Sequence, residues 1–323
     1  MSLPRLLAHA IHKPNFQTVP DYLNFCARYL EFIGNENNYQ AEIVSQNERW
    51  YRFYQYLEDG NYNVTRPINS DLMYQSESFA VAAPLFEEVL DGLRAGERPG
   101  DEYRQVVTRV IYTVQQSIGA TLDALPAGES NKARKINGDL FERFIQVLIR
   151  RLGIDCTAGV IQVPIKDAAG EVVHKMTYQH DLMIRSEMKL KVIGSVKTSS
   201  KDRIDKIFMD KFFYSKITET ALPHIAIFLN DVQRKRSGRE NRYGVNATFL
   251  SGHFKAYTIV LNALDGVYYC DIRPNMVNDP FLSQHIKTID HLFYNDLWSL
   301  IAVEGLSLDE VVIAEEDPDD DSD

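Results

Sequence analysis

The chain of 323 residues lacks the features that mark several classes of protein. It has only three cysteines, and no two of them form a CxxC pair, which excludes a disulfide scaffold or a cysteine-rich zinc site. No apolar run reaches the roughly 18 residues that suggest a membrane span, and the first residues show no signal-peptide pattern. We therefore expect a cytoplasmic protein with no membrane partner.

Motifs for zinc and nucleotide chemistry are also missing. The eight histidines show no HExxH spacing, and there is no glycine-rich Walker loop. The sequence thus predicts neither zinc nor a nucleotide cofactor. What it does have is an ordinary globular composition, with 45% hydrophobic and 25% charged residues, which suffices for a sizeable core.

The net charge of −10 is unevenly distributed. Residues 189–242 contain 13 lysines and arginines against 6 acids, a local excess of +7 that leaves −17 for the remainder. Residues 315–323 contain seven acids and predict a disordered acidic tail. Because salt confines the field of exposed charges to roughly 8–10 Å, a local basic stretch can still bind nucleic acid.

Hydrophobic periodicity separates a helical part from a mixed part. Residues 1–126 are predicted to be mostly helical, since apolar residues recur at every fourth position from Val106 to Leu122. This region could dimerise or wrap DNA. A turn-rich junction follows at 126–130, and then an amphipathic helix runs to Gly153.

Beyond that helix the pattern changes to short apolar runs. The predicted strands are 157–164, 176–184, 189–197, 223–229 and 257–261. A helix is predicted over 202–217, between the third and the fourth of them. This order favours a mixed α/β fold, with a central sheet flanked by helices over 131–305.

Two acids and a lysine occupy neighbouring predicted elements. Asp181 lies on one strand, Lys197 ends the next strand sixteen residues later, and Asp210 lies on the following helix. A hairpin of that length brings Asp181 and Lys197 side by side. Carboxylates suit Mg²⁺, and a lysine can orient the attacking water or stabilise charge on a phosphate. The set suits a magnesium-dependent phosphodiester hydrolase, whereas the pair of Asp181 and Lys197 taken alone favours a solvated hairpin with ordinary surface charges. The rest of the pattern decides between the two.

The run from Ser195 to Arg203 resembles the Type II restriction endonucleases of the CCGG-recognising, EcoRII/NgoMIV-like branch of the PD-(D/E)xK nuclease superfamily. In that branch a serine stands two residues before the lysine, as Ser195 does before Lys197. The displaced acid follows about thirteen residues after the lysine, at the position of Asp210. The resemblance covers roughly residues 131–260 and implies a restriction-endonuclease-like fold.

The same family carries a basic-acidic-basic triplet four residues after the lysine. Lys201, Asp202 and Arg203 match this triplet, which the resemblance implies reads C:G pairs. Guanine offers two major-groove acceptors to a basic side chain, and the cytosine amino group can donate to a carboxylate. A charged first helical turn is the alternative, and a shifted register over 203–206 is another.

A second stretch of the family pattern lies upstream. Residues 137–142 resemble the family's Gly-x-x-Phe-Glu helix, whose glutamate, here Glu142, faces the metal site. Whether Asp210 or Glu142 is the main second ligand beside Asp181 stays open. The family usually has a proline directly before the first acid, where this chain has His180.

Three further basic residues are candidates for DNA contacts. Arg234, Lys235 and Arg236 belong to a predicted loop after a strand. They would touch phosphates and add sequence-independent affinity, or else form a solvated loop.

The patterns together predict a bacterial Type II restriction endonuclease that cuts double-stranded DNA at a palindrome containing CC and GG. Whether the site is CCGG or the interrupted CCNGG stays open. Cutting two strands of a symmetric site implies a homodimer or a higher oligomer. The alternatives are a non-catalytic DNA-binding protein on the same fold, a repair or structure-specific nuclease, and a helical interaction protein.

Overall fold

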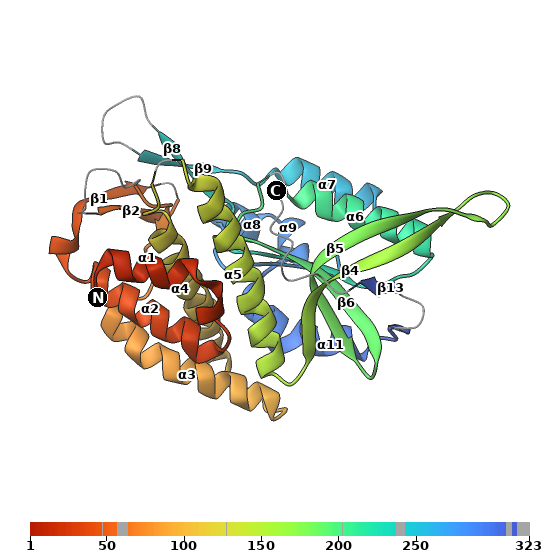
Figure 1. Cartoon of the computed structure of the whole chain (residues 1–323), viewed down its shortest axis with the longest axis horizontal. Helices are drawn as coiled ribbons and strands as arrows, with labels where there is room; N and C mark the ends of the chain where they lie inside the picture. Colours follow the sequence, from red (N-terminus) through yellow and green to blue (C-terminus); the bar gives the residue numbers. More distant parts are fainter. Residues whose placement is uncertain are drawn as a thin grey trace.

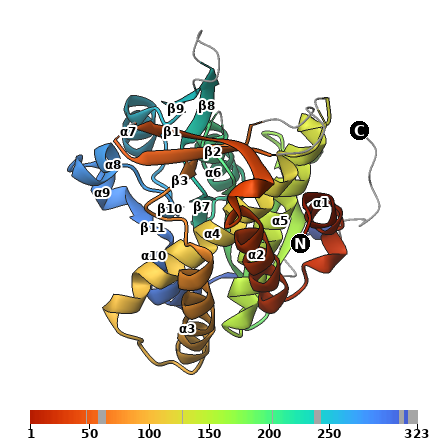
Figure 2. The same ribbon diagram turned by 90° about the vertical axis from the view of Figure 1, so that its left-hand side faces the viewer.

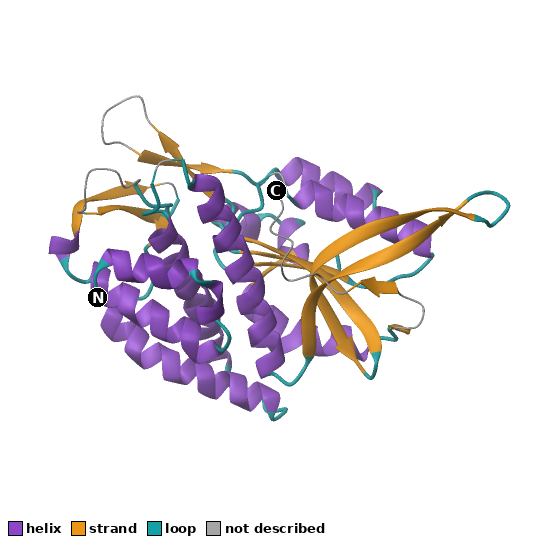
Figure 3. Ribbon diagram, in the orientation of Figure 1, coloured by secondary structure: helices purple, strands orange, loops and turns teal. Residues whose placement is uncertain are grey.

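The computed structural model describes residues 1–46, 48–56, 64–126, 128–201, 203–236, 243–307 and 312–314. Within these ranges the chain forms a mixed eight-stranded sheet with helices on both faces and a helical bundle at one side (Figures 1 and 3). The predicted α/β class with a central sheet is confirmed. The predicted acidic tail, 315–323, lies outside the described residues.

The helical bundle is built around one buried helix. The bundle helices are α1 (Leu3–Ile11), α2 (Val19–Ile33), α3 (Ser76–Arg94) and α4 (Arg104–Leu122), with short turns η1 (Lys13–Asn15), η2 (Glu36–Asn38) and η3 (Asp101–Tyr103). Every residue of α4 from Ile111 to Leu122 is buried. Its neighbours therefore cover it on all sides, and its buried polar groups need internal partners.

Among the described residues no helix is long and apolar enough to cross a membrane.

The N-terminal region also contains a small antiparallel sheet, so the prediction of a mostly helical region is wrong over 39–46, 50–56 and 68–69. Its strands are β1 (Tyr39–Gln46), β2 (Trp50–Tyr56) and β3 (Ile68–Asn69). The aromatic residues of β2 lie within the region predicted to be mostly helical. Tyr51 and Phe53 instead alternate with exposed or half-buried residues and pack against Val232 and Val245. Aromatic residues at a spacing of two favour a half-buried strand.

The central sheet combines an antiparallel half with a parallel half. Its strands are β4 (Asp155–Lys166), β5 (Val172–Ser186), β6 (Lys189–Lys197), β7 (His224–Phe228), β10 (Gly266–Tyr269), β11 (Ile286–Thr288), β12 (Leu306–Ser307) and β13 (Val312–Ala314). The spatial order is β11-β10-β7-β6-β5-β4-β13, and β12 pairs with the start of β6. Strands β4, β5 and β6 are antiparallel, whereas β6, β7, β10 and β11 run parallel. Four of the five predicted strands are confirmed.

Helices cover the two faces of this sheet. On one face α5 (Ser130–Arg151) places Leu140 and Phe144 in the same core as Val196 and the N-terminal helices. On the other face α6 (Ile204–Thr218) and α7 (Ser251–Val260) pack Phe208 and Phe254 against the sheet. Figure 1 shows α5 between the N-terminal helices and the sheet, and in Figure 2 the helices α2 and α3 lie in front. The residues before and after 126 thus share one hydrophobic core.

The fifth predicted strand, 257–261, is wrong because this run forms the end of α7. Its β-branched residues suggested a strand, but burial has helical spacing: Phe254 and Thr258 are buried four residues apart, while Ile259 is 71% exposed. The remaining elements are β8 (Val232–Arg236), β9 (Tyr243–Ala247), α8 (Pro274–Asn278), α9 (Leu282–His285), α10 (Ile289–His291), the π-helical turn η4 (Leu292–Asp296) and α11 (Leu297–Ala302).

Candidate active site

The candidate active site forms where β5 and β6 lie side by side. Lys197 is the last residue of β6, and its Nζ donates to Oδ2 of Asp181 on β5 at 2.6 Å. The same oxygen accepts a hydrogen bond from the backbone N–H of Val196 at 2.7 Å. The antiparallel pairing of the two strands therefore produces the predicted neighbourhood of Asp181 and Lys197.

Helix α5 supplies the third charged group. Nζ of Lys197 donates to Oε1 of Glu142 at 2.9 Å, so one ammonium bridges two carboxylates. Glu142 reaches the strands because the apolar face of α5 packs on the sheet through Leu140 and Phe144. The structure thus brings together Asp181, Lys197 and Glu142, which are far apart in the sequence.

Burial and the unequal charges of this trio together set its electrostatics. Burial raises the pKa of Glu142 to about 7, with Asp181 adding to the shift and Lys197 opposing it. One ammonium cannot fully offset two carboxylates, so Glu142 holds its proton more tightly. Burial lowers the pKa of Lys197, but Asp181 and Glu142 outweigh this and raise it above its ordinary value. Lys197 is therefore a cation at neutral pH.

A residue that the sequence analysis did not single out fixes the strand that carries Asp181. Nε2 of Gln146, one helical turn after Glu142, donates to the backbone oxygen of Asp181 at 2.9 Å. Helix α5 thus supplies a charged group and also holds the backbone at the first acid. A side chain that acts on a distant backbone leaves no spacing signal in the sequence.

The structure does not bring Asp210 into contact with the trio. Asp210 lies on α6, where it forms an ion pair with Lys206 at 3.9 Å. Burial raises its pKa, and Lys206 lowers it. The described residues contain no group of three or more His, Cys, Asp or Glu placed to bind a metal ion. Ser195 lies on β6 opposite Ala226 and is half-buried. The roles of Asp210 and Ser195 stay predictions.

His180 occupies the position before Asp181 where the resemblance suggested a proline. Its ring is buried beside Tyr178 and Tyr214, with ring centroids 6.3 Å away in both cases, and beside His224 at 6.2 Å. Burial lowers the pKa of His180 to about 3, and His224 adds to this. A neutral histidine therefore fills an aromatic cluster beneath the strand.

Two residues of the predicted base-reading triplet, Lys201 and Arg203, lie directly before α6. Lys201 and Arg203 are exposed, and the backbone N–H of Lys201 donates to Oγ of Ser199 at 3.2 Å. Asp202 lies outside the described residues. The two basic side chains thus extend into solvent a few residues from Lys197, at the same edge of the sheet.

The second basic stretch forms a strand and not a loop, which corrects the prediction for Arg234, Lys235 and Arg236. They belong to β8, which pairs with β9. The run is polar and so suggested a loop, but Val232 anchors it on β2. Arg234 donates to the backbone oxygen of Val64, and Lys235 is exposed. The side chain of Arg236 lies outside the described part.

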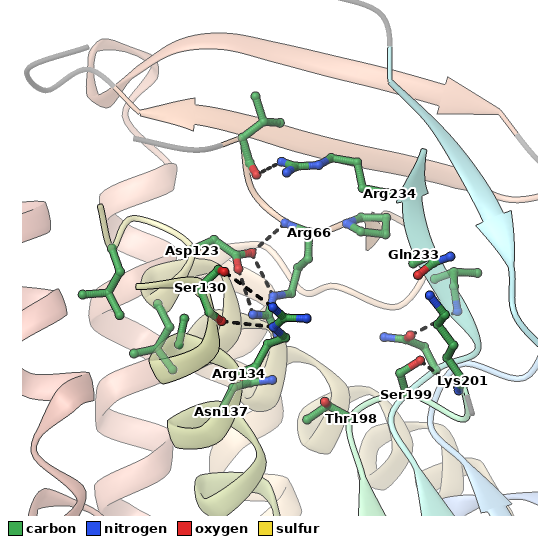
Figure 4. A pocket seen from close by; sticks show the side chains of 17 residues that line it. Arg66, Asp123, Ser130, Arg134, Asn137, Thr198, Ser199, Lys201, Gln233 and Arg234 are labelled. Carbon is green, nitrogen blue, oxygen red and sulfur yellow. Dashed lines mark hydrogen bonds and ion pairs between the residues drawn. The ribbon is translucent and has the colours of Figure 1, made fainter. Parts of the chain in front are cut away.

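A cavity of about 470 Å³ opens beside these groups (Figure 4). It is bounded by the start of α5, the segment after β6, strand β8 and the segments before β3 and after α4. Arg66, Arg134, Lys201 and Arg234 are its cationic lining residues. Sequence reasoning missed the cavity because its walls come from five separate segments.

Comparisons with known proteins were informative only at the level of structure. No protein-family model and no curated protein sequence matches the chain. The solved structure of the Type IIP restriction endonuclease Kpn2I is similar, with a TM-score of 0.67 and 17% identity, over 94% of this chain and 98% of that chain. The complex of restriction endonuclease PspGI with substrate DNA has a TM-score of 0.39 and 12% identity, over 70% of this chain and 91% of that chain. The similarity to Kpn2I confirms that the chain has a restriction-endonuclease-like fold.

Proposed function

We propose that this protein is a Type II restriction endonuclease that hydrolyses both strands of double-stranded DNA at a palindrome containing CC and GG. One observation carries the proposal: the ammonium of Lys197 lies 2.6 Å from Asp181 and 2.9 Å from Glu142 at the end of a strand. The similarity of the fold to that of Kpn2I supports it. A site built on rigid strands and a helix is typical of catalysis that depends on position.

The donor set fits Mg²⁺ in its chemistry. Asp181 and Glu142 each engage Lys197 through one oxygen, and no described residue donates a hydrogen bond to the second oxygen of either carboxylate. Carboxylate oxygens are the ligands that Mg²⁺ prefers, and the ion usually keeps several waters. Asp181 and Glu142 would hold the ion, and Asp210 is a further candidate ligand. A bound Mg²⁺ would polarise the phosphate and lower the pKa of a water molecule.

Lys197 acts on the phosphate and on the attacking water. Its raised pKa keeps it protonated at neutral pH, so it stabilises negative charge that develops on the phosphate oxygens. The carboxylates of Asp181 and Glu142 hold the ammonium in place before substrate arrives. Such fixed charges cost no reorganisation during the reaction. By the resemblance, Ser195 stands where other PD-(D/E)xK nucleases have an acid, and it carries no charge there.

Basic groups around this site would hold and read the DNA. Lys201, Asp202 and Arg203 would contact base edges, and Arg234 and Lys235 would contact phosphates. Arg236 continues the same strand. A palindrome has two equivalent half-sites, so a homodimer would place one copy of the site on each strand. For a site interrupted by one base pair, expulsion of the central base is one way to bring the two half-site readers into register, at a cost of a few kcal/mol.

A non-catalytic DNA-binding protein is the second candidate, and it is favoured by the place of Asp210, whose ion pair is with Lys206. Cleavage of supercoiled plasmid in Mg²⁺, by the protein and by Asp181→Asn, separates the two. We expect the protein to linearise the plasmid and the variant to be slower by about 10³-fold or more. Equal cleavage by the protein and by Asp181→Asn would show that the candidate active site does not carry out the cleavage.

A further inference from the structure

The cavity beside β6 adjoins the candidate active site on two elements. Thr198 and Ser199 line it and directly follow Lys197, so they lie within roughly 7 Å of that residue along the chain. On α5, Asn137 lines it five residues before Glu142, which corresponds to about 7.5 Å along the helix axis. A group bound in the cavity would therefore lie next to the bond that is cut.

Two buried carboxamides present donors to the cavity. Asn137 is 2% exposed, and its Oδ1 accepts a hydrogen bond from Nε2 of Gln115 at 2.9 Å. Asn230 is 6% exposed, and its Oδ1 accepts from the backbone N–H of Val232 at 3.2 Å. Because the oxygen of each amide is engaged by the protein, the NH₂ group is the end that remains for a ligand. No described residue accepts a hydrogen bond from either NH₂ group.

The charged groups of the lining leave a net positive cavity. Asp123, the one carboxylate among the described lining residues, is bound by Arg66 through two hydrogen bonds of 2.9 Å. This pair neutralises itself. Arg134, Lys201 and Arg234 lie around the same cavity and, among the described residues, have no carboxylate partner. Figure 4 shows Arg134 and Asn137 on α5 facing Lys201 and Gln233 across the cavity.

This lining distinguishes a phosphate from a nucleobase. A base is normally held by stacking on an aromatic ring, and by donors and acceptors together on its polar edge. The described lining residues include no aromatic side chain and no unpaired carboxylate. A phosphate needs several donors and positive charge, which Asn137, Asn230 and the basic residues supply. The start of α5 adds a favourable dipole.

We propose that this cavity binds a phosphate of the DNA strand adjacent to the phosphate that is cut, through Asn137 and Arg134 on α5 and Arg234 on β8. The inference rests on the proposed function, because it takes DNA as the substrate. It assigns a role to Asn137 and Arg134, which the proposed catalytic chemistry does not use. The cavity would fix the position of the strand relative to Lys197, whereas the triplet after β6 would read bases.

The experiment measures affinity for a fluorescent mixed-sequence duplex in Ca²⁺, over NaCl from about 50 to 200 mM. Arg134→Gln should make the slope of log affinity against log salt shallower by about 0.9. The ratio of the protein's affinity to the variant's affinity should therefore fall about 3.5-fold between 50 and 200 mM NaCl. Asn137→Asp keeps the size but places a carboxylate against the phosphate, and should weaken binding by at least about tenfold. Lys132→Gln is the matched control, because Lys132 pairs with Glu129 and does not line the cavity.

Unchanged slope and affinity in both variants would overturn the phosphate assignment while leaving the nuclease proposal intact. An unchanged slope with altered preference among duplex sequences would also overturn it, because the cavity would then hold a base. If the protein does not cut DNA but the expected salt slopes are observed, the nuclease assignment is refuted and the phosphate site in the cavity is supported. Thermal unfolding of each variant shows that a weak binder is folded, and Arg134→Gln provides the test if Asn137→Asp does not fold.

Discussion

Replacement of Lys197 by alanine removes a cation that contacts both carboxylates of the candidate active site. Its Nζ lies 2.6 Å from Asp181 and 2.9 Å from Glu142. Without it, two carboxylates remain close together in a partly buried place. Lys197 lowers the pKa of Glu142, so its loss raises that pKa above its present value of about 7. A larger share of Glu142 would then be protonated at neutral pH and unable to hold a cation.

The expected effect on cleavage is large, and the effect on binding is small. One electrostatic contact to the transition state contributes about 10²- to 10³-fold. We therefore expect Lys197→Ala to cut about 10²- to 10³-fold more slowly, a loss of about 3–4 kcal/mol in transition-state stabilisation. DNA affinity should change by less than about threefold, since the ammonium is already engaged by Asp181 and Glu142.

The assay pairs plasmid cleavage in Mg²⁺ with duplex binding in Ca²⁺, each with the protein and the variant. Lys189→Ala is the matched control, because Lys189 begins the strand that Lys197 ends and pairs with exposed Glu304 at 3.3 Å. We expect this control to cut and bind as the protein does. A Lys197→Ala variant that cuts at the normal rate, or that loses binding while still cutting, would refute the assignment.

Three further predictions concern single side chains. Asp202→Ala should relax discrimination at C:G pairs by about 1–3 kcal/mol per contact. An unchanged preference among cleaved sequences would show that the triplet does not read bases. Glu142→Gln should raise the Mg²⁺ concentration for half-maximal cleavage about 10- to 100-fold, and an unchanged requirement would exclude Glu142 as a ligand. Burial lowers the pKa of His224 to about 4, so between pH 6.5 and 4 the unfolded chain binds a proton that the folded chain does not. Folding stability should therefore fall by up to about 3 kcal/mol as the pH drops through that window, and His224→Asn should remove this loss in urea titrations; equal pH dependence of both proteins would contradict it.

The central hairpin and its site could be predicted because their signals are local. The strands β4, β5 and β6 alternate or are apolar and are separated by turns, so their order and pairing follow from the sequence. Once that pairing is assumed, Asp181 and Lys197 must meet, as they do at 2.6 Å. Glu142 has no such local signal. Its place came from the family resemblance, and the packing of α5 on the sheet confirms that it reaches Lys197.

The missed elements depend on contacts between distant segments. The strand β8 is polar from Gln233 to Arg236, and it is a strand because Val232 packs on Phe53 of β2. Nothing in the sequence of either strand predicts that the two strands pack together. The run at the end of α7 is β-branched, but tertiary burial of Phe254 and Thr258 at helical spacing overrides that preference. The cavity beside β6 likewise requires several segments at once.

The most direct test of the central claim is digestion of bacteriophage DNA by the purified protein in Mg²⁺ and in EDTA, followed by sequencing of the fragment ends. We expect discrete, magnesium-dependent fragments whose ends share one palindrome containing CC and GG. Intact DNA in Mg²⁺, at protein concentrations that shift the same DNA in a gel with Ca²⁺, would contradict the nuclease assignment and identify a DNA-binding protein that does not cut.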